Sequence, residues 1–119
     1  MKKGGPSIPK PKEPSKLEVL FLSLVREAGL PEPEPQLRLV PGRKFAFDFS
    51  WPEAKLTVEV QGGTWVKGGH SSGSGIAKDA EKSILAQLEG WRVFPVTSNQ
   101  IKSGEAIEWV TRGLVLWTR

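Results

Sequence analysis

The sequence has 119 residues, enough for one domain with a hydrophobic core but too few for two domains. It contains no cysteine, which excludes a disulfide framework, a thiolate nucleophile and a zinc site built from cysteines. No apolar run approaches the ~20 residues of a membrane span, and no apolar segment follows the basic start, so we expect a cytoplasmic protein without membrane contact.

The net charge of +4 falls entirely in the first 16 residues, which carry five lysines against one glutamate. Residues 1–14 are also rich in proline and glycine, so we predict a disordered arm there and a single domain over residues 15–119. A basic arm suits non-specific contact with nucleic-acid phosphates through counterion release, and it equally suits a solubilising tail. The candidate phosphate contacts in the arm are Lys2, Lys3, Lys10 and Lys12.

Residues 15–29 are predicted to form a helix. Ser15 is a favourable N-cap, Glu18 follows three residues later at the spacing of a capping box, and Gly29 is typical of a helix end. Glu18 therefore has a sufficient structural role. A second role, in which it reaches towards an acidic pair further along the chain, stays open.

Residues 31–35 hold three prolines and are predicted to form a stiff connector. Apolar and polar residues then alternate over residues 36–40, which predicts a first strand. The Pro-Gly pair at residues 41–42 turns the chain into a strand–turn–strand unit over residues 45–61.

The unit over residues 45–61 alternates with period two on both sides of a turn at residues 51–54. With a four-residue turn, Asp48 faces Thr57, and Glu59 lies one step diagonally from Asp48 on the same face. Two carboxylates at the roughly 7–8 Å of a diagonal pair repel each other but can share a divalent cation. Acidic residues on the solvent face of a hairpin are also common, and the spacing alone does not decide between the two interpretations.

Residues 62–75 are rich in glycine and predict a mobile loop, which leaves directly from Gln61 and so must lie near the carboxylates. The chain's only histidine, His70, suits a general acid or base, a phosphate contact, or a residue exposed to solvent. Trp65 suits either stacking on an unpaired base or anchoring of the loop. Lys67 is a further candidate for nucleic-acid contact.

Residues 76–89 carry apolar residues four apart and predict a second helix, which Gly90 ends. Residues 91–97 predict a last strand, in which Pro95 favours an edge position or a bulge. Residues 103–117 predict a final helix.

Two lysines of the second predicted helix, Lys78 and Lys82, lie in its first half. Both are candidates for nucleic-acid contact, and Lys82 is the better candidate for binding a phosphate. Asp79 and Lys82 also have the i, i+3 spacing of an ordinary surface ion pair, which is the competing interpretation.

The predicted order is therefore helix, three strands, helix, strand and helix. Short turns allow the first three strands to be antiparallel, and the helical crossover allows the last strand to pair in parallel. This predicts an α/β (α+β) fold with a mixed four-stranded sheet flanked by helices.

Motifs on this frame resemble those of the PD-(D/E)XK nuclease superfamily, which has a restriction-endonuclease-like core. Asp48, ten further residues and then Glu59-Val60-Gln61 match its motif spacing. The downstream patterns G-G-x-W-x-x-G-G-H, D-x-x-K and G-W-x-V are similar to those of its small phage and bacterial branch, related to very-short-patch repair endonucleases and Holliday junction resolvases. The resemblance covers residues 15–97.

The resemblance implies a metal-dependent endodeoxyribonuclease that acts on branched, nicked or duplex DNA in phage recombination, repair or packaging. Asp48 and Glu59 would ligate Mg²⁺ or Mn²⁺, with the backbone carbonyl of Val60 as a further ligand and Glu18 in the place of an additional acidic residue. No small-molecule cofactor is implied. Because one small subunit would make one cut, symmetric substrates imply a homodimer. If a phage encodes the protein, its location is the host cytoplasm.

The sequence departs from the family pattern at Gln61, where the family has a lysine. A glutamine can orient the attacking water but brings no positive charge, which leaves Lys82, Lys78 or His70 to supply it. A second interpretation is a non-catalytic nucleic-acid-binding module of nuclease-like fold, although the retained acidic pair argues against decay. A weaker third interpretation is a metal-binding interaction domain within a larger phage complex.

Overall fold

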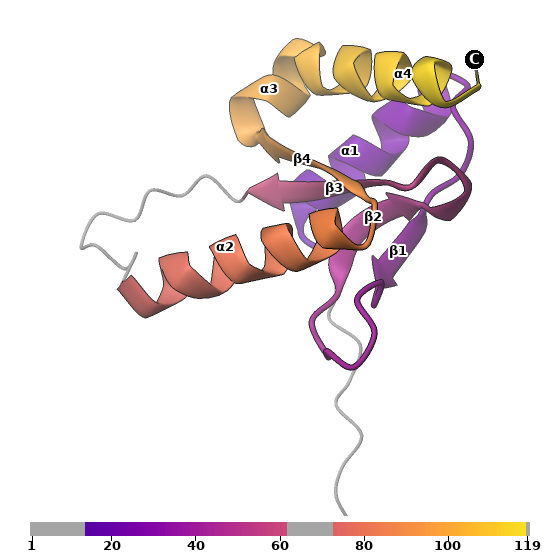
Figure 1. Cartoon of the computed structure of the whole chain (residues 1–119). Helices are drawn as coiled ribbons and strands as arrows, with labels where there is room; N and C mark the ends of the chain where they lie inside the picture. The colour runs from indigo at the N-terminus through magenta and orange to yellow at the C-terminus, as the bar shows by residue number, and fades with distance from the viewer. Residues whose placement is uncertain (1–13, 62–72, 119) are drawn as a thin grey trace, which may run out of the picture.

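The computed structural model of the chain describes residues 14–61 and 73–118. Its sheet has the order β1-β2-β3-β4, with antiparallel pairs β1–β2 and β2–β3 and a parallel pair β3–β4 (Figure 1). The predicted mixed sheet flanked by helices is confirmed. The elements in chain order are α1 (Lys16–Glu27), β1 (Glu34–Leu37), β2 (Phe47–Trp51), the 3₁₀ turn η1 (Pro52–Ala54), β3 (Leu56–Gln61), α2 (Gly73–Leu88), β4 (Arg92–Thr97), α3 (Ser98–Ser103) and α4 (Glu105–Thr118).

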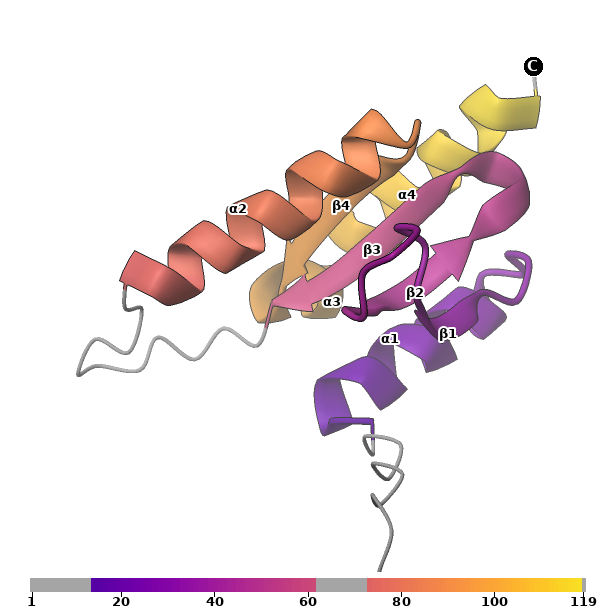
Figure 2. The same ribbon diagram turned by 60° about the horizontal axis from the view of Figure 1, so that its bottom comes forward.

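Different helices cover the two faces of the sheet. Helices α1, α3 and α4 lie over one face, and α2 lies over the other (Figures 1 and 2). Beneath α1, α3 and α4 is the larger core, which includes Phe21, Phe49, Leu56, Val58, Val96, Ile101 and Val110. Beneath α2 is the smaller core, whose buried residues are Val40, Phe47, Ala86 and Trp91.

Helix α1 begins as the sequence predicts. The Ser15 side chain accepts a hydrogen bond from the Glu18 amide at 3.1 Å, and Glu18 Oε1 accepts one from the Ser15 amide at 3.0 Å. These reciprocal bonds are the capping box, and they satisfy two amides that have no partner within the helix. Gly29 follows the helix with a φ of +74°, which favours glycine.

Each of the two edge strands of the sheet, β1 and β4, contains a proline, and β1 begins earlier in the chain than predicted. Strand β1 occupies residues 34–37 rather than 36–40, so Pro35 belongs to the strand and not to a connector. An edge strand tolerates proline because one side of it needs no amide donor. Pro95 was predicted to mark an edge or a bulge, and β4 is indeed an edge strand.

The register of the β2–β3 hairpin differs from the expected one by two residues. Ser50 lies opposite Thr57, where Asp48 was expected. Both residues are buried and their hydroxyl oxygens are 2.7 Å apart, a pairing that the expected register lacks. Since the side-chain period of a strand is two, an even shift keeps Asp48 and Glu59 on one face.

The turn itself explains the shift in register. It runs through η1 and Lys55 rather than through residues 51–54, so Trp51 remains in β2 and is buried. Lys55 closes the turn with a left-handed φ of 52°. A single-sequence pattern does not show that a lysine adopts this backbone conformation, because it is uncommon for residues other than glycine.

The helices after the hairpin also differ in extent from the prediction. Helix α2 begins at Gly73 rather than at residue 76. The expected final helix over residues 103–117 is α4, and a helix outside the prediction, α3, precedes it across Gly104, which has a φ of +91°. Thr97 and Gln100 form a capping box at the start of α3. The sequence contains this spacing, so α3 was within reach of sequence analysis. No helix in the two described ranges is long and apolar enough to cross a membrane.

Candidate active site

The site forms where β2 and β3 begin to separate, on the face of the sheet that α2 covers. The hairpin register, continued by one step, places Asp48 directly opposite Glu59 rather than diagonal to it. The Asp48 amide donates to Glu59 Oε1 at 3.2 Å, and the Val60 amide donates to Asp48 Oδ2 at 2.8 Å. Each strand thus holds the carboxylate of the other, and the two carboxylates face the same side.

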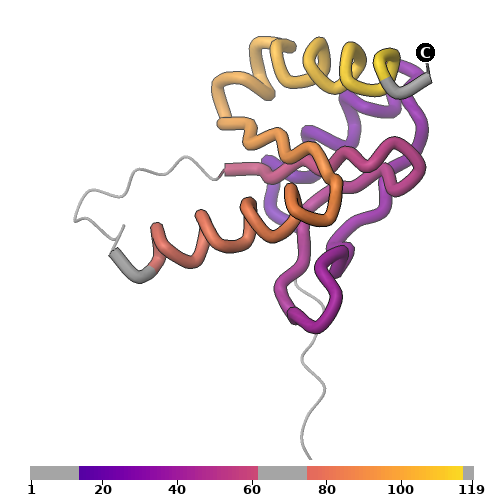
Figure 3. The backbone as a smooth tube through the Cα atoms, viewed as in Figure 1, coloured from indigo at the N-terminus to yellow at the C-terminus, as the bar shows by residue number. Residues whose placement is uncertain are grey.

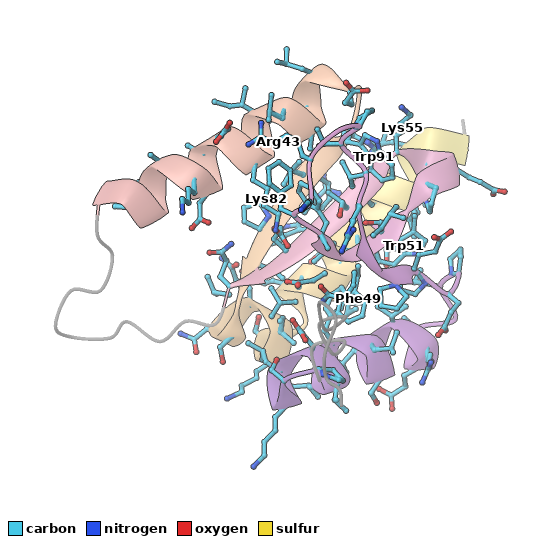
Figure 4. All side chains as sticks on the ribbon, turned by 90° about the horizontal axis from the view of Figure 1, so that it is seen from below. Arg43, Phe49, Trp51, Lys55, Lys82 and Trp91 are labelled. Carbon is cyan, nitrogen blue, oxygen red and sulfur yellow. The ribbon has the colours of Figure 1, made fainter. Side chains whose placement is uncertain are left out.

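Lys82 reaches this acidic pair from α2. Its Nζ forms an ion pair with Glu59 Oε2, and the two side chains are 21% and 16% exposed. The same ammonium lies 4.5 Å from the centroid of the Phe47 ring. Figure 4 shows the Lys82 side chain between α2 and the sheet. The predicted alternative, a surface pair with Asp79, is therefore wrong: Lys82 pairs with Glu59 instead.

Burial and neighbouring charges together set the pKa of the Glu59 carboxyl group. Burial raises the pKa of Glu59, the ion pair with Lys82 lowers it, and the charge of Asp48 raises it again. The net pKa lies above the ordinary value of a glutamate. A cation placed between the two carboxylates would act as Lys82 does and favour the ionised form.

Gln36 belongs to the site although sequence analysis did not single it out. Its Nε2 donates to Asp48 Oδ1 at 3.3 Å, so both oxygens of Asp48 are held, one by Gln36 and one by Val60. Gln36 has a φ of 51° within β1, a left-handed conformation that is strained for a residue with a Cβ. No sequence pattern indicates such a conformation for a glutamine.

The other predicted site residues lie at the end of β3, on α2, at the start of α1 or outside the described ranges. Gln61 lies exposed at the end of β3, opposite Thr97 of β4. Lys78 is exposed on α2. Glu18 serves the capping box, and within residues 14–61 and 73–118 no group of three or more histidine, cysteine or acidic residues comes together that could hold a metal. The predictions for Trp65, Lys67, His70 and the lysines of the arm concern residues outside the described ranges.

The donor chemistry of the acidic pair fits a hard divalent cation. Mg²⁺ prefers carboxylate oxygens and is commonly held by only one or two carboxylates, with waters and substrate phosphate oxygens completing its shell. Asp48 and Glu59 supply two carboxylates on one face, and each carboxylate oxygen retains a lone pair beyond the hydrogen bond it accepts. Lys82 offsets one of the two negative charges of the pair.

Comparison with known proteins concerns the fold. No family model matches the sequence, and no curated protein matches it. Among solved structures, the chain is similar to the homing endonuclease I-Bth0305I catalytic domain, with a TM-score of 0.66 and 16% sequence identity. The likeness covers 88% of this chain and 99% of that domain. The chain has a nuclease-like fold. At this level of identity, any function of the site is argued from its own geometry.

Proposed function

We propose that this chain is a metal-dependent endodeoxyribonuclease of the PD-(D/E)XK superfamily, in the branch related to very-short-patch repair endonucleases and junction resolvases. One observation carries the proposal: Asp48 and Glu59 are direct cross-strand neighbours, and Lys82 reaches them from a helix. This arrangement lies in a chain whose fold resembles that of an endonuclease catalytic domain.

Asp48 and Glu59 hold the metal in this proposal, with the Val60 carbonyl as a further ligand. Mg²⁺ or Mn²⁺, when bound, lowers the pKa of a coordinated water and stabilises the charge that develops on the phosphate. Gln36 and the Val60 amide keep the Asp48 carboxylate oriented before substrate arrives. Such preorganisation lowers the reorganisation cost of the reaction.

Lys82 supplies the positive charge that Gln61 lacks. Its ammonium already contacts Glu59, and the Phe47 ring holds it on the site side of α2. With Glu59 engaged by a metal, the Lys82 ammonium would be available to bind a phosphate oxygen. Gln61, at the exposed end of β3, orients the attacking water.

The substrate of this proposal is DNA in branched, nicked or duplex form, in phage recombination, repair or packaging. A homodimer would place two sites about a two-fold axis and allow paired cuts in a symmetric junction. Gln61 and Lys78 are exposed and would be accessible to a bulky substrate.

A cleavage assay tests the proposal. Supercoiled plasmid, linear duplex, flap and four-way-junction DNA are incubated with Mg²⁺, Mn²⁺ or a chelator. We expect cutting only with metal and expect Asp48→Asn and Glu59→Gln to abolish it. Glu53→Gln, an exposed acid on the hairpin turn, is the matched control and should cut normally. Cutting that survives loss of both carboxylates would show that the site lies elsewhere.

The Lys82–Glu59 ion pair also supports a second candidate function, a non-catalytic nucleic-acid-binding module. In that case Lys82 neutralises Glu59 permanently, and Gln61 reflects the loss of activity. DNA binding without cleavage under every metal would favour it. Gln61→Lys would then be the variant to examine for restored cutting.

A further inference from the structure

The connection between β1 and β2 is strongly basic. Residues 38–46 contain three basic residues and no acidic one, and all three are exposed: Arg38, Arg43 and Lys44. The connection ends at residue 46, directly before β2 and two residues before Asp48. It projects from the sheet on the side of α2 (Figures 1 and 3).

The basic connection is anchored by its apolar residues. Val40 is buried in the smaller core, and Leu39 and Phe45 pack against the same core. The core also contains Ala86 of α2 and Trp91, so the connection, α2 and the sheet share one set of contacts. The apolar side chains therefore hold the backbone in place while the basic side chains remain in solvent.

A row of cations and aromatic rings runs from the connection to the acidic pair. The Arg43 guanidinium lies 5.0 Å from the centroid of the Phe45 ring, and that ring meets Phe47 edge-on at 6.1 Å. The row ends at Lys82, whose ammonium lies over the Phe47 ring. Figure 4 shows Arg43 and Lys82 both between the connection and α2.

Arg43 is also oriented by a carboxylate. Its guanidinium donates to Glu81 Oε2 of α2 at 2.9 Å, and both side chains remain at least 40% exposed. The planar guanidinium fits phosphate as well as carboxylate, and an exposed pair of this kind is weak enough for a phosphate to join or replace the glutamate. Arg38 and Lys44 form no ion pair with any residue in the described ranges.

We infer that residues 38–46 form a phosphate-binding platform that holds the DNA backbone beside the scissile phosphate, through Arg38, Arg43 and Lys44. The inference rests on the proposed nuclease function, because it takes the acidic pair as the point where the phosphate is cut. Exposed positive charge, of which only that of Arg43 has an acidic partner in the described ranges, a fixed backbone and a row that leads to the site favour a polyanion of regular phosphate spacing. The contacts are to phosphates, so the platform adds affinity and orientation without reading sequence.

Salt-dependent binding tests the platform. The full chain and the variant Arg38→Gln/Arg43→Gln/Lys44→Gln are titrated onto fluorescent duplex and junction DNA in chelator, by anisotropy, across a range of salt. Each lost phosphate contact reduces the magnitude of the slope of log K against log salt by about 0.9. For the triple variant we therefore expect this magnitude to fall by up to ~2.7, with weaker DNA binding at low salt. The matched control, Lys16→Gln/Lys102→Gln/Arg112→Gln, removes equal charge from α1, α3 and α4 and should change the slope much less.

The outcomes separate the platform from the nuclease proposal. An equal loss of slope in both triple variants, or no loss in either, overturns the platform even if the chain cuts DNA. A selective loss in a chain that never cuts supports the platform and refutes the nuclease. If the platform triple variant fails to fold, as judged by circular dichroism, Arg38→Gln and Lys44→Gln are measured singly. Each should lower the slope by about 0.9, and an unchanged slope in both overturns the inference.

Discussion

The two faces of the sheet differ in what they bury. The face under α1, α3 and α4 carries the larger core, which is built from apolar side chains such as Phe21, Phe49 and Val58. The face under α2 carries the smaller core and, next to it, Asp48, Glu59 and Lys82. Helix α2 also leaves Ile76, Ile84 and Leu88 exposed. We therefore expect the first face to supply most of the stability, whereas the second accommodates charges that a closely packed core would exclude.

The largest expected effect is on stability, and it compares one phenylalanine from each face. Phe49→Ala removes a buried ring from the larger core and should lower the free energy of unfolding by about 3–5 kcal/mol. Phe45→Ala, from the partly exposed edge of the smaller core, should cost only about 1–2 kcal/mol. Urea denaturation of both variants measures the difference. Equal costs would show that the smaller core contributes as much as the larger one.

Removal of Lys82 tests whether the α2 face tolerates its charges only as a pair. Lys82→Met leaves Glu59 without its cation and should lower the free energy of unfolding by roughly 1–3 kcal/mol at neutral pH. The double variant Lys82→Met/Glu59→Gln should recover most of this loss. Saturating Mg²⁺ should raise the melting temperature of Lys82→Met more than that of the original chain, because the metal no longer competes with the ammonium. Equal shifts would contradict the competition.

The pKa of Glu59 sets a pH dependence on the same face. Burial raises the pKa of Glu59 in the folded state above its value in the unfolded state. Below the unfolded pKa, Glu59 is protonated in both states, and its contribution to stability is fully present. That stability is lost as pH rises through the folded pKa, since the folded chain must then bury an ionised carboxylate. We expect melting temperatures in chelator to decline over this window and Mg²⁺ to reverse the decline. Glu59→Gln should remove both responses, and a decline that persists in this variant would assign it to another group.

The smallest expected effect concerns the strained backbone at Gln36. Gln36→Gly relieves a left-handed conformation that costs roughly 1–2 kcal/mol in the folded state. Glycine also increases the entropy of the unfolded chain, which offsets part of this gain. The free energy of unfolding should therefore rise by about 1 kcal/mol or less. The variant also loses the bond to Asp48 and should bind Mg²⁺ or Mn²⁺ more weakly. Lys55→Gly is the control, because Lys55 has a similar φ of 52° away from the site. Calorimetric titration with Mn²⁺ should show weaker binding for Gln36→Gly alone.

Local signals in the sequence predict the structure where neighbouring residues decide it. The Ser15–Glu18 capping box predicted the start of α1, and the proline in β4 predicted an edge strand. The order of elements predicted the mixed sheet. The same spacing occurs at Thr97 and Gln100 and favours the start of α3, a helix outside the prediction. Capping and turn preferences act within a few residues, so the chain needs no tertiary contact to express them.

The sequence by itself also determined which carboxylates share a face, because Asp48 and Glu59 keep their parity under an even shift in register. Only the tertiary structure decided that they are direct neighbours, since the turn at Lys55 and the buried Ser50–Thr57 pair set the register. The contacts of Lys82 and Gln36 with this pair join elements distant in the chain. Such contacts depend on how a helix and an edge strand dock on the sheet, and no local pattern of residues encodes that geometry.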